Sequence, residues 1–293
     1  MDNEANAAQR EYWNTVAGPR WVGLAGLVEA RVRKVNDLLL ARSAVVRGEK
    51  VLEVGCGTGA ATVPLAEAVG DGGEVLGVDI SGPMLAGARQ RISQSGLDNV
   101  TLLQADAQTY RFQPDYFDLI TSRFGVMFFS DPVAAFRNLR GAARPGGRLC
   151  FACWAPLAEN PQWLISYEVA LRYLGPPAPK DPRAPGPFAL ADQDYARSIL
   201  EQAEYEAIEI HRETPDIIGS TPGEEAEFAC IMGPSRVLID EKQPDDATLT
   251  RIKQEMTEAF AAHAKGEEML LPSTIFLVTA RRAPAEIGSK PPR

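Results

Sequence analysis

The segment Val51-Leu52-Glu53-Val54-Gly55-Cys56-Gly57-Thr58-Gly59 is the most informative part of the chain. Its first four residues are typical of a buried strand, and three alternate glycines then lead into a helical stretch. Glycine lets the backbone turn sharply and lets a ligand approach without meeting a side chain. A strand that enters a helix through such a turn predicts an α/β sheet whose ligand lies at the carboxyl ends of the strands.

The acids near this loop indicate what kind of ligand it binds. A dinucleotide fingerprint would be Gly-x-Gly-x-x-Gly, but here the third glycine arrives one residue early, and Glu53 lies two residues before the first. A carboxylate there would repel a pyrophosphate, yet it suits a cationic ligand or an ammonium. Asp79, 24 residues after Gly55, is placed like the acid that binds ribose hydroxyls in nucleotide-binding folds. We expect Glu53 and Asp79 to face one shared cavity.

The rest of the first half repeats the same alternation of strand and helix. Apolar runs at 51–54, 75–78, 100–103, 119–121 and 149–153 predict strands. Helices are expected to begin near Thr58, Ser81 and Asp131, and two of them to end at Gly70 and Gly96. Strands that are apolar on both faces and joined by helices predict a doubly wound, mostly parallel sheet.

The flanking regions add a cap and insertions. Apolar spacing in residues 12–47 predicts two helices, with a break near Gly18-Pro19. Prolines crowd residues 176–187 and preclude regular structure there. Beyond them we expect helices at 192–203, 222–240 and 246–264, a strand around Ile208 and Ile210, and a last strand at 274–280. The predicted organisation is a helical cap (1–47), a ligand-binding core (48–155), the rest of the sheet with lid insertions (156–283) and a flexible tail (284–293).

Composition limits the class of protein and of partner. The chain has 293 residues, 45% of them hydrophobic and 24% charged, as in a globular protein rather than a disordered one. Its net charge of -9 disfavours nucleic acid as a partner. No basic leader with an apolar run begins the chain and no apolar stretch is long enough for a membrane span, so we expect a cytoplasmic location. Cys150 and Cys153 have the spacing of metal ligands, but positions three apart in a strand face opposite sides and no second ligand pair is present, so no metal site is expected.

Taken together, five motifs resemble those of the class I S-adenosylmethionine-dependent methyltransferases. The likeness covers roughly residues 45–155 and, within the family, is greatest to the small-molecule enzymes of the ubiquinone and menaquinone biosynthesis type. It implies a Rossmann-like fold with a seven-stranded, mostly parallel sheet. The motifs are Glu53-Val-Gly-Cys-Gly-Thr-Gly59, Gly77-Val-Asp-Ile-Ser81 with Met84 after it, Ala105-Asp-Ala107, Phe117-Asp-Leu-Ile120 and Arg144-Pro-Gly-Gly147.

The resemblance implies S-adenosylmethionine as cofactor and assigns residues to it. Asp79 would bind the ribose hydroxyls, Ile80 would pack on adenine, and Asp106 would accept from the adenine amino group, with Ala107 giving a backbone contact. Ser122 and Arg123 would line the sulfonium end. The remaining predicted cofactor residues are Gly55, Cys56, Gly57, Thr58, Gly59 and Met84, with Cys56 as a small filler.

Methyl transfer from a sulfonium is an in-line displacement that needs alignment and exclusion of water more than covalent help. The acceptor would be a small organic molecule, with oxygen, nitrogen and carbon all open as the methylated atom. A base is needed only if the acceptor loses a proton, so catalytic residues stay unassigned, and Tyr12, His211 and His263 are the candidates. The expected substrate contacts are Trp13 and Trp21 as a lid, and Phe124 and Met127 as pocket wall or core.

Two other functions remain open from the sequence. An NAD-dependent oxidoreductase would need a helix start that accepts pyrophosphate, against which Glu53 and the early third glycine argue. A non-catalytic nucleotide-binding partner protein would bind the same cofactor in a pocket closed to acceptors. The sequence gives no evidence on oligomeric state.

Overall fold

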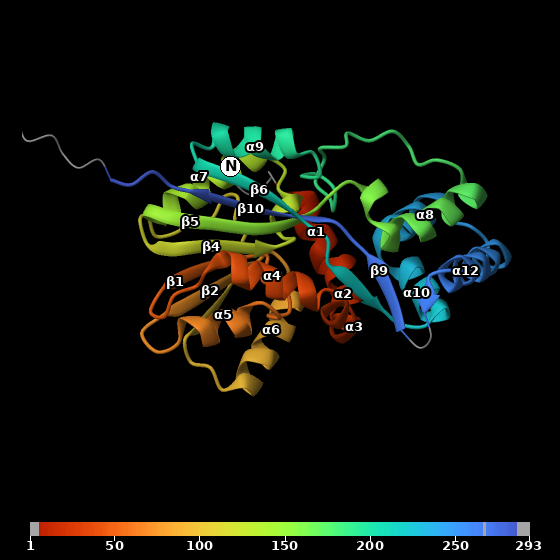
Figure 1. Ribbon diagram of the computed structural model, residues 1–293, viewed down its shortest axis with the longest axis horizontal. Helices are drawn as coiled ribbons and strands as arrows, with labels where there is room; N and C mark the ends of the chain where they lie inside the picture. Colours follow the sequence, from red (N-terminus) through yellow and green to blue (C-terminus); the bar gives the residue numbers. More distant parts are fainter. Residues whose placement is uncertain (1–5, 266–267, 286–293) are drawn as a thin grey trace, which may run out of the picture.

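A seven-stranded sheet in the order β3-β2-β1-β4-β5-β10-β6 forms the centre of the molecule (Figure 1). The computed structural model describes residues 6–265 and 268–285, so most of the expected tail lies outside the described residues. Neighbouring strands among β1 to β5 are parallel, while β10 runs antiparallel to β5 and β6. This confirms the predicted doubly wound, mostly parallel sheet. The strands are β1 Lys50–Val54, β2 Glu74–Asp79, β3 Val100–Gln104, β4 Phe117–Arg123, β5 Ala143–Trp154, β6 Glu206–Glu213 and β10 Ile275–Arg281.

Helices cover both faces of this sheet, with α4, α5 and α6 on one face and α7 and α9 on the other (Figure 1). Two expected helix starts are confirmed, because Ser81 and Asp131 accept hydrogen bonds from backbone N–H groups as N-caps. The helix after the glycine loop begins at Thr62 and not near Thr58. Its delay follows from the loop glycines, which all have positive φ and so cannot be helical. These helices are α4 Arg33–Ser43, α5 Thr62–Val69, α6 Gly82–Ser95, α7 Pro132–Ala142 and α9 Gln193–Gln202.

The N-terminal region forms four helices, so the expectation of two helices with a break at Gly18-Pro19 is wrong. Pro19 lies in the first turn of α2, where a backbone N–H has no helical partner and a proline costs little. The chain instead bends at Val16, Leu24 and Val32, which cap successive helices. The three helices before α4 are α1 Ala7–Thr15, α2 Ala17–Gly23 and α3 Ala25–Arg31.

A second group of elements, called the outer lobe below, lies on the far side of α1–α3 from the sheet (Figure 1). It has a small sheet in the order β7-β9-β8, and Arg31 of α3 forms a buried ion pair with Glu225 of α10. The proline-rich stretch before α9 has no helix or strand, as predicted. The lobe comprises α8 Pro161–Leu174, β7 Asp216–Gly219, α10 Pro222–Ile231, α11 Gly233–Lys242, α12 Asp246–Ala261, β8 Ala264–Lys265 and β9 Glu268–Pro272. Short 3-10 helices occupy η1 Val126–Phe128 and η2 Leu157–Glu159.

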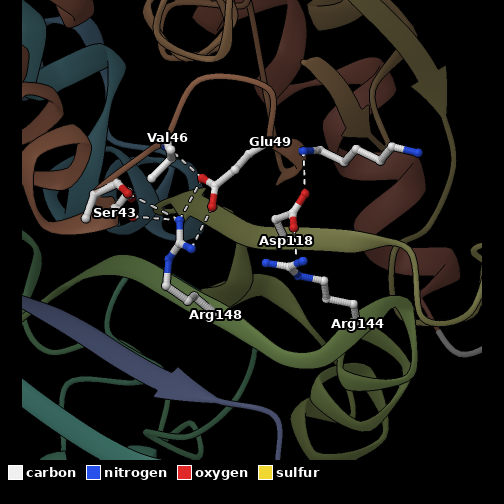
Figure 2. A network of polar contacts seen from close by, with 8 residues as sticks. Ser43, Val46, Glu49, Asp118, Arg144 and Arg148 are labelled. Carbon is white, nitrogen blue, oxygen red and sulfur yellow. Dashed lines mark hydrogen bonds and ion pairs between the residues drawn. The ribbon is translucent and has the colours of Figure 1, made fainter. Parts of the chain in front are cut away.

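An ion-pair network ties β1, β4 and β5 together at the amino end of β1, opposite the glycine loop (Figure 2). Arg148 donates to both carboxylate oxygens of Glu49, at 2.7 and 2.8 Å, and Glu49 also accepts from the Val46 N–H. Asp118 accepts from the Lys50 N–H and pairs with Arg144. The network fixes the entry to β1, on which the position of the glycine loop depends.

Replacing Arg148 by methionine is expected to lower the free energy of unfolding by about 1–3 kcal/mol at pH 7. The substitution leaves the Glu49 carboxylate, only 10% exposed, without its bidentate partner. Chemical denaturation measures the loss. Arg47→Met is the matched control, because the Arg47–Asp71 pair is exposed and its loss should change stability by less than about 0.5 kcal/mol.

The Glu49–Arg148 ion pair makes the loss of stability in Arg148→Met depend on pH. Burial opposes ionisation of Glu49, but the hydrogen bonds from Arg148 and Val46 outweigh it and lower its pKa below the ordinary 4.5. A lowered folded-state pKa stabilises the fold above the unfolded value, and this contribution is lost as pH falls through the folded value. The difference between wild type and Arg148→Met should therefore shrink below about pH 4.5. A difference that stays constant from neutral to strongly acidic pH contradicts this account.

Candidate active site

The loop between β1 and α5 is held by its own backbone. The N–H groups of Gly55 and Cys56 donate to the carbonyl of Val78 on β2, at 2.8 and 3.1 Å. A Cβ atom on Gly55 would lie 2.7 Å from the Cα atom of Gly125, so two glycines allow the segments after β1 and β4 to touch. Glycine therefore serves internal packing here as well as the ligand access expected from the sequence.

Two carboxylates flank this loop, on β1 and β2. Glu53 is 2% exposed and accepts a hydrogen bond of 2.5 Å from the Thr62 hydroxyl. Asp79 accepts from the N–H groups of Gly57 and Ser81, both at 2.8 Å. Both therefore point to the glycine loop and the first turns after it.

Glu53 lines a small cavity. It measures about 10 Å³, room for about one water molecule, and Asp79 is not among its lining residues. The Asp79 carboxylate instead accepts from the N–H groups of Gly57 and Ser81, and a cavity shared by the two acids stays a prediction. Buried inside the cavity wall, the hydroxyls of Ser43 and Thr121 have no hydrogen-bond partner among the described residues. The lining residues are Asn36, Leu39, Leu40, Ser43, Glu53, Ala61, Pro64, Leu65, Thr121 and Arg123.

Burial dominates the electrostatics of these groups. It raises the pKa of Glu53 to about 7, although the hydrogen bond from Thr62 and the charge of Arg123 act in the opposite direction. The negative charge of Asp79 adds to the rise. Burial also raises the pKa of Asp79, against its bonds from Ser81 and Gly57. Burial also raises the pKa of the Cys56 thiol well above its usual value, which disfavours the reactive thiolate.

Replacing Glu53 by glutamine is expected to stabilise the protein at pH 8 relative to wild type, and much less at pH 5. A raised folded-state pKa favours folding below the unfolded value near 4.5, and that advantage is lost as pH rises through about 7. Ionised Glu53 thus costs up to about 3 kcal/mol at pH 8, which the neutral amide avoids. Urea denaturation at the two pH values measures the difference. An equal effect of Glu53→Gln at both pH values contradicts the raised pKa.

The first N-terminal helix lies across the loops that follow β2 and β3. Asn14 donates to the Ile80 carbonyl at 3.1 Å and accepts from the Gly82 N–H at 2.9 Å. The Ser81 hydroxyl donates to the Trp13 carbonyl at 2.8 Å. The residue just before the helix, Asn6, reaches the carboxylate of Asp106, whose backbone neighbour is Ala107. Sequence reasoning missed Asn6 and Asn14, because no local pattern marks two asparagines as partners of distant loops.

The third N-terminal helix contacts the glycine loop itself. Glu29 accepts from the Thr58 hydroxyl at 2.9 Å and from Arg91 of α6 with both of its carboxylate oxygens. Arg91 also donates to the Thr58 carbonyl at 2.9 Å. Neither Glu29 nor Arg91 was expected at the site. The N-terminal helices thus contact the loops after β1, β2 and β3, and Met84 of α6 packs against Gly57 in the same region.

The two residues expected at the sulfonium end, Ser122 and Arg123, differ in what their side chains contact. Ser122 is buried, donates to the Val54 carbonyl and accepts from the Gly125 N–H, so its hydroxyl is used inside the protein. Arg123 faces the Glu53 cavity. Phe124 has φ 65°, a strained conformation for an aromatic residue, and its ring stacks on Trp154 at 4.3 Å between centroids.

The residues expected to contact substrate lie in different places, on the N-terminal helices and in the segment after β4. Trp13 packs edge-on against Phe128 of the segment after β4, at 5.1 Å between ring centroids, and Trp21 lies 6.1 Å from Trp13. Their role as a lid stays a prediction. Met127 is 2% exposed and belongs to the core. Tyr12, a candidate base, is 42% exposed and touches Trp13 edge-on.

The two histidines lie away from these loops. His211 is on β6, which β4, β5 and β10 separate from β1, and it contacts Glu209 at 3.0 Å. His263 is an exposed residue that follows α12 in the outer lobe. No group of three His, Cys, Asp or Glu side chains suited to a metal ion occurs in residues 6–265 and 268–285.

Comparison with known proteins identifies relatives of the core. The family description "Methyltransferase domain" matches residues 51–147. Over 106 residues the chain is 41% identical to aklanonic acid methyltransferase DauC of a Streptomyces species, an alignment covering 36% of this chain and 48% of that protein. It is 33% identical over 181 residues to the ubiquinone/menaquinone biosynthesis C-methyltransferase UbiE of Burkholderia cenocepacia, covering 59% of this chain and 73% of that enzyme. The chain thus spans about half the length of the first of these relatives.

Solved structures share the fold. One is phosphoethanolamine N-methyltransferase 2 of Haemonchus contortus in complex with phosphomonomethylethanolamine and S-adenosylhomocysteine. It superimposes with a TM-score of 0.52 at 20% identity, covering 85% of this chain and 52% of that one. At this identity the likeness concerns the fold alone.

Proposed function

The chain belongs to the S-adenosylmethionine-dependent methyltransferases, and from this premise we propose that it transfers a methyl group from S-adenosylmethionine to a small organic acceptor. The observation that carries the proposal is the pair of carboxylates, Glu53 and Asp79, on either side of the glycine loop. A pyrophosphate coenzyme would be repelled there, whereas a cationic donor is attracted. The comparisons give no support to the alternative of an NAD-dependent oxidoreductase.

The residues present fit this donor chemically. Asp79 can accept from two ribose hydroxyls, and Asp106 can accept from an adenine amino group, because carboxylates are acceptors only. Glu53, Arg123 and the unpartnered Thr121 hydroxyl would reach the charged amino-acid end of the donor through one water molecule, because the cavity that they line is too small for the amino acid itself. Ile80 would pack on adenine. The other proposed donor contacts are Gly55, Cys56, Gly57, Thr58, Gly59, Met84 and the backbone of Ala107.

When bound, S-adenosylmethionine supplies a methyl group activated by its positively charged sulfur. The protein has to hold the acceptor in line with that group and keep water away. Trp13 and Trp21 would exclude water from above, and Phe124, fixed on Trp154, would form the wall next to the acceptor. We give Ser122 the role of positioning the segment after β4 rather than of contacting the donor. No described group is yet assigned as a base.

The relatives' names favour a small acceptor, since aklanonic acid and the ubiquinone and menaquinone precursors are small organic molecules. An apolar acceptor suits a site bordered by the aromatic rings of α1, α2 and the segment after β4. In the described part of the chain, no helix combines the length and the apolar character that crossing a membrane requires. The cytoplasmic location stays a prediction from the sequence.

The test is a transfer assay with S-adenosylmethionine and a panel of phenols, quinols, amines and isoprenoids. We expect release of S-adenosylhomocysteine together with one acceptor whose mass rises by one methyl group in place of a hydrogen. Calorimetry with S-adenosylmethionine and with NAD runs in parallel. Binding of NAD without binding of S-adenosylmethionine overturns the proposal. Tight binding of S-adenosylmethionine with no transfer to any member of a broad panel favours the non-catalytic binding protein instead.

A further inference from the structure

We propose that Asn6 is an internal competitor of the donor: its side-chain amide occupies the Asp106 carboxylate, and adenine must displace it to bind. This inference rests on the proposed function, in which Asp106 receives the adenine amino group. It adds a closed state of the donor site, in which Asn6 bonds Asp106. The Asn6–Asp106 contact is called the latch below.

The Asn6 and Asp106 side chains are both buried and hydrogen-bonded to each other. Asn6 and Asp106 are 5% and 7% exposed. The Asn6 amide nitrogen lies 3.0 Å and 2.9 Å from the two carboxylate oxygens of Asp106, and 3.3 Å from the side-chain oxygen of Gln108. The Asn6 amide oxygen accepts from the Ser130 N–H at 3.0 Å. Every polar atom of the Asn6 side chain therefore has a partner.

The amide resembles the group that it is proposed to exclude. The nitrogen of a carboxamide and the exocyclic nitrogen of adenine are both planar NH₂ donors conjugated to a π-system. The Asn6 nitrogen bonds both oxygens of Asp106, so an adenine amino group would have to approach the same buried carboxylate. One of these oxygens already takes a second hydrogen bond, from the Gln108 N–H at 2.9 Å. A buried carboxylate with these partners leaves little access for adenine while Asn6 stays.

The groups that bind the Asn6 amide are themselves held by further hydrogen bonds. The Gln108 side-chain oxygen also accepts from the Asp131 N–H at 3.0 Å and faces the Ser130 hydroxyl at 3.3 Å. Gln108 and Ser130 come from the loops after β3 and before α7, so two separate segments converge on one amide. Because the Asn6 amide has buried partners on two separate segments, its position indicates a defined state rather than a chance surface contact.

Asn6 directly precedes α1, and the same helix holds the loop after β2 through Trp13 and Asn14. Releasing Asn6 would thus loosen one end of a helix that lies over the donor loops. If the open state is a minor fraction of the protein, the apparent affinity for the donor is lowered by that fraction. Removing the latch should recover the lost affinity.

The test compares wild type with Asn6→Ser by calorimetry with S-adenosylhomocysteine. Serine is a favourable residue at the start of a helix, so α1 should still form, but its side chain is too short to bridge Asp106 and Gln108. We expect roughly tenfold tighter binding by Asn6→Ser, as for removal of one hydrogen bond to a charged group. Thr15→Ala is the matched control, because the Thr15 hydroxyl bonds only within α1 and its loss should leave the affinity unchanged.

Hydrogen exchange gives a second readout that needs no acceptor. Adding S-adenosylhomocysteine to wild type should speed exchange at the Arg10 amide, which donates to the Asn6 carbonyl at 2.8 Å, because adenine displaces Asn6. Slower exchange there on binding overturns the latch. So does a wild type that binds the ligand while Asn6→Ser binds equally or more weakly, and the proposed function then stands. If neither protein binds S-adenosylhomocysteine, the proposed function fails, and the latch fails with it.

Discussion

Replacing Asp79 by asparagine is expected to weaken binding of S-adenosylhomocysteine by about a hundredfold or more. In the proposed site, the Asp79 carboxylate accepts from both ribose hydroxyls, while the N–H groups of Gly57 and Ser81 hold it in place. Each hydrogen bond to a charged group contributes about 1.5–3 kcal/mol, and every 1.4 kcal/mol changes the affinity tenfold. An amide keeps the size of the side chain but presents a donor where an acceptor is needed. Calorimetry measures the change.

The matched control for this substitution is Asp71→Asn. Asp71 is fully exposed, and its pair with Arg47 contributes little, so the affinity should not change. Because Asp79 also orders the glycine loop, the stability of Asp79→Asn has to be measured by denaturation, and binding compared well below its unfolding temperature. Affinity within about threefold of wild type would show that the ribose is bound elsewhere and would remove the main support for the proposed donor site.

Much of the fold was predictable because its signals are local. The apolar runs of β1 to β5 and the caps Ser81 and Asp131 depend on a few neighbouring residues, and the structure confirms them. The N-terminal helices were not predicted correctly, because Pro19 lies in the first turn of α2, where it does not break a helix, and the end of α1 is held by the distant loop after β2. The outer-lobe helix α8 was not among the predicted helices, although Pro161 in its first turn and Gly175 just after its end are local signals of its bounds.

The candidate site shows the same division. The two acids and the glycine loop were predictable from their spacing, since each follows directly from the end of a strand. The partners of Asp106 were not, because Asn6 lies 100 residues away in the sequence and only the folded cap brings it there. The inward use of the Ser122 hydroxyl depends likewise on a backbone carbonyl of another strand. Sequence therefore indicates which groups the strands present, while tertiary packing decides which of them are already occupied.

Replacing Gly55 by alanine is expected to lower the free energy of unfolding by about 3 kcal/mol or more and to abolish donor binding. Two separate penalties add here. The backbone of Gly55 has φ 68°, which costs a residue with a side chain about 1–2 kcal/mol. The added methyl group would also lie 2.7 Å from the Cα atom of Gly125, a backbone atom that cannot move without shifting the segment after β4. Denaturation and calorimetry with S-adenosylhomocysteine measure the two effects.

Gly96→Ala separates these penalties. Gly96 ends α6 with φ 70°, nearly that of Gly55, but a Cβ atom there would meet nothing within 4 Å. It should therefore show the backbone cost alone, about 1–2 kcal/mol, with the affinity for S-adenosylhomocysteine unchanged. The difference between the two substitutions then measures the contact between Gly55 and Gly125. If both variants lose equal stability and both retain binding, the close approach of the segments after β1 and β4 is not what positions the donor site.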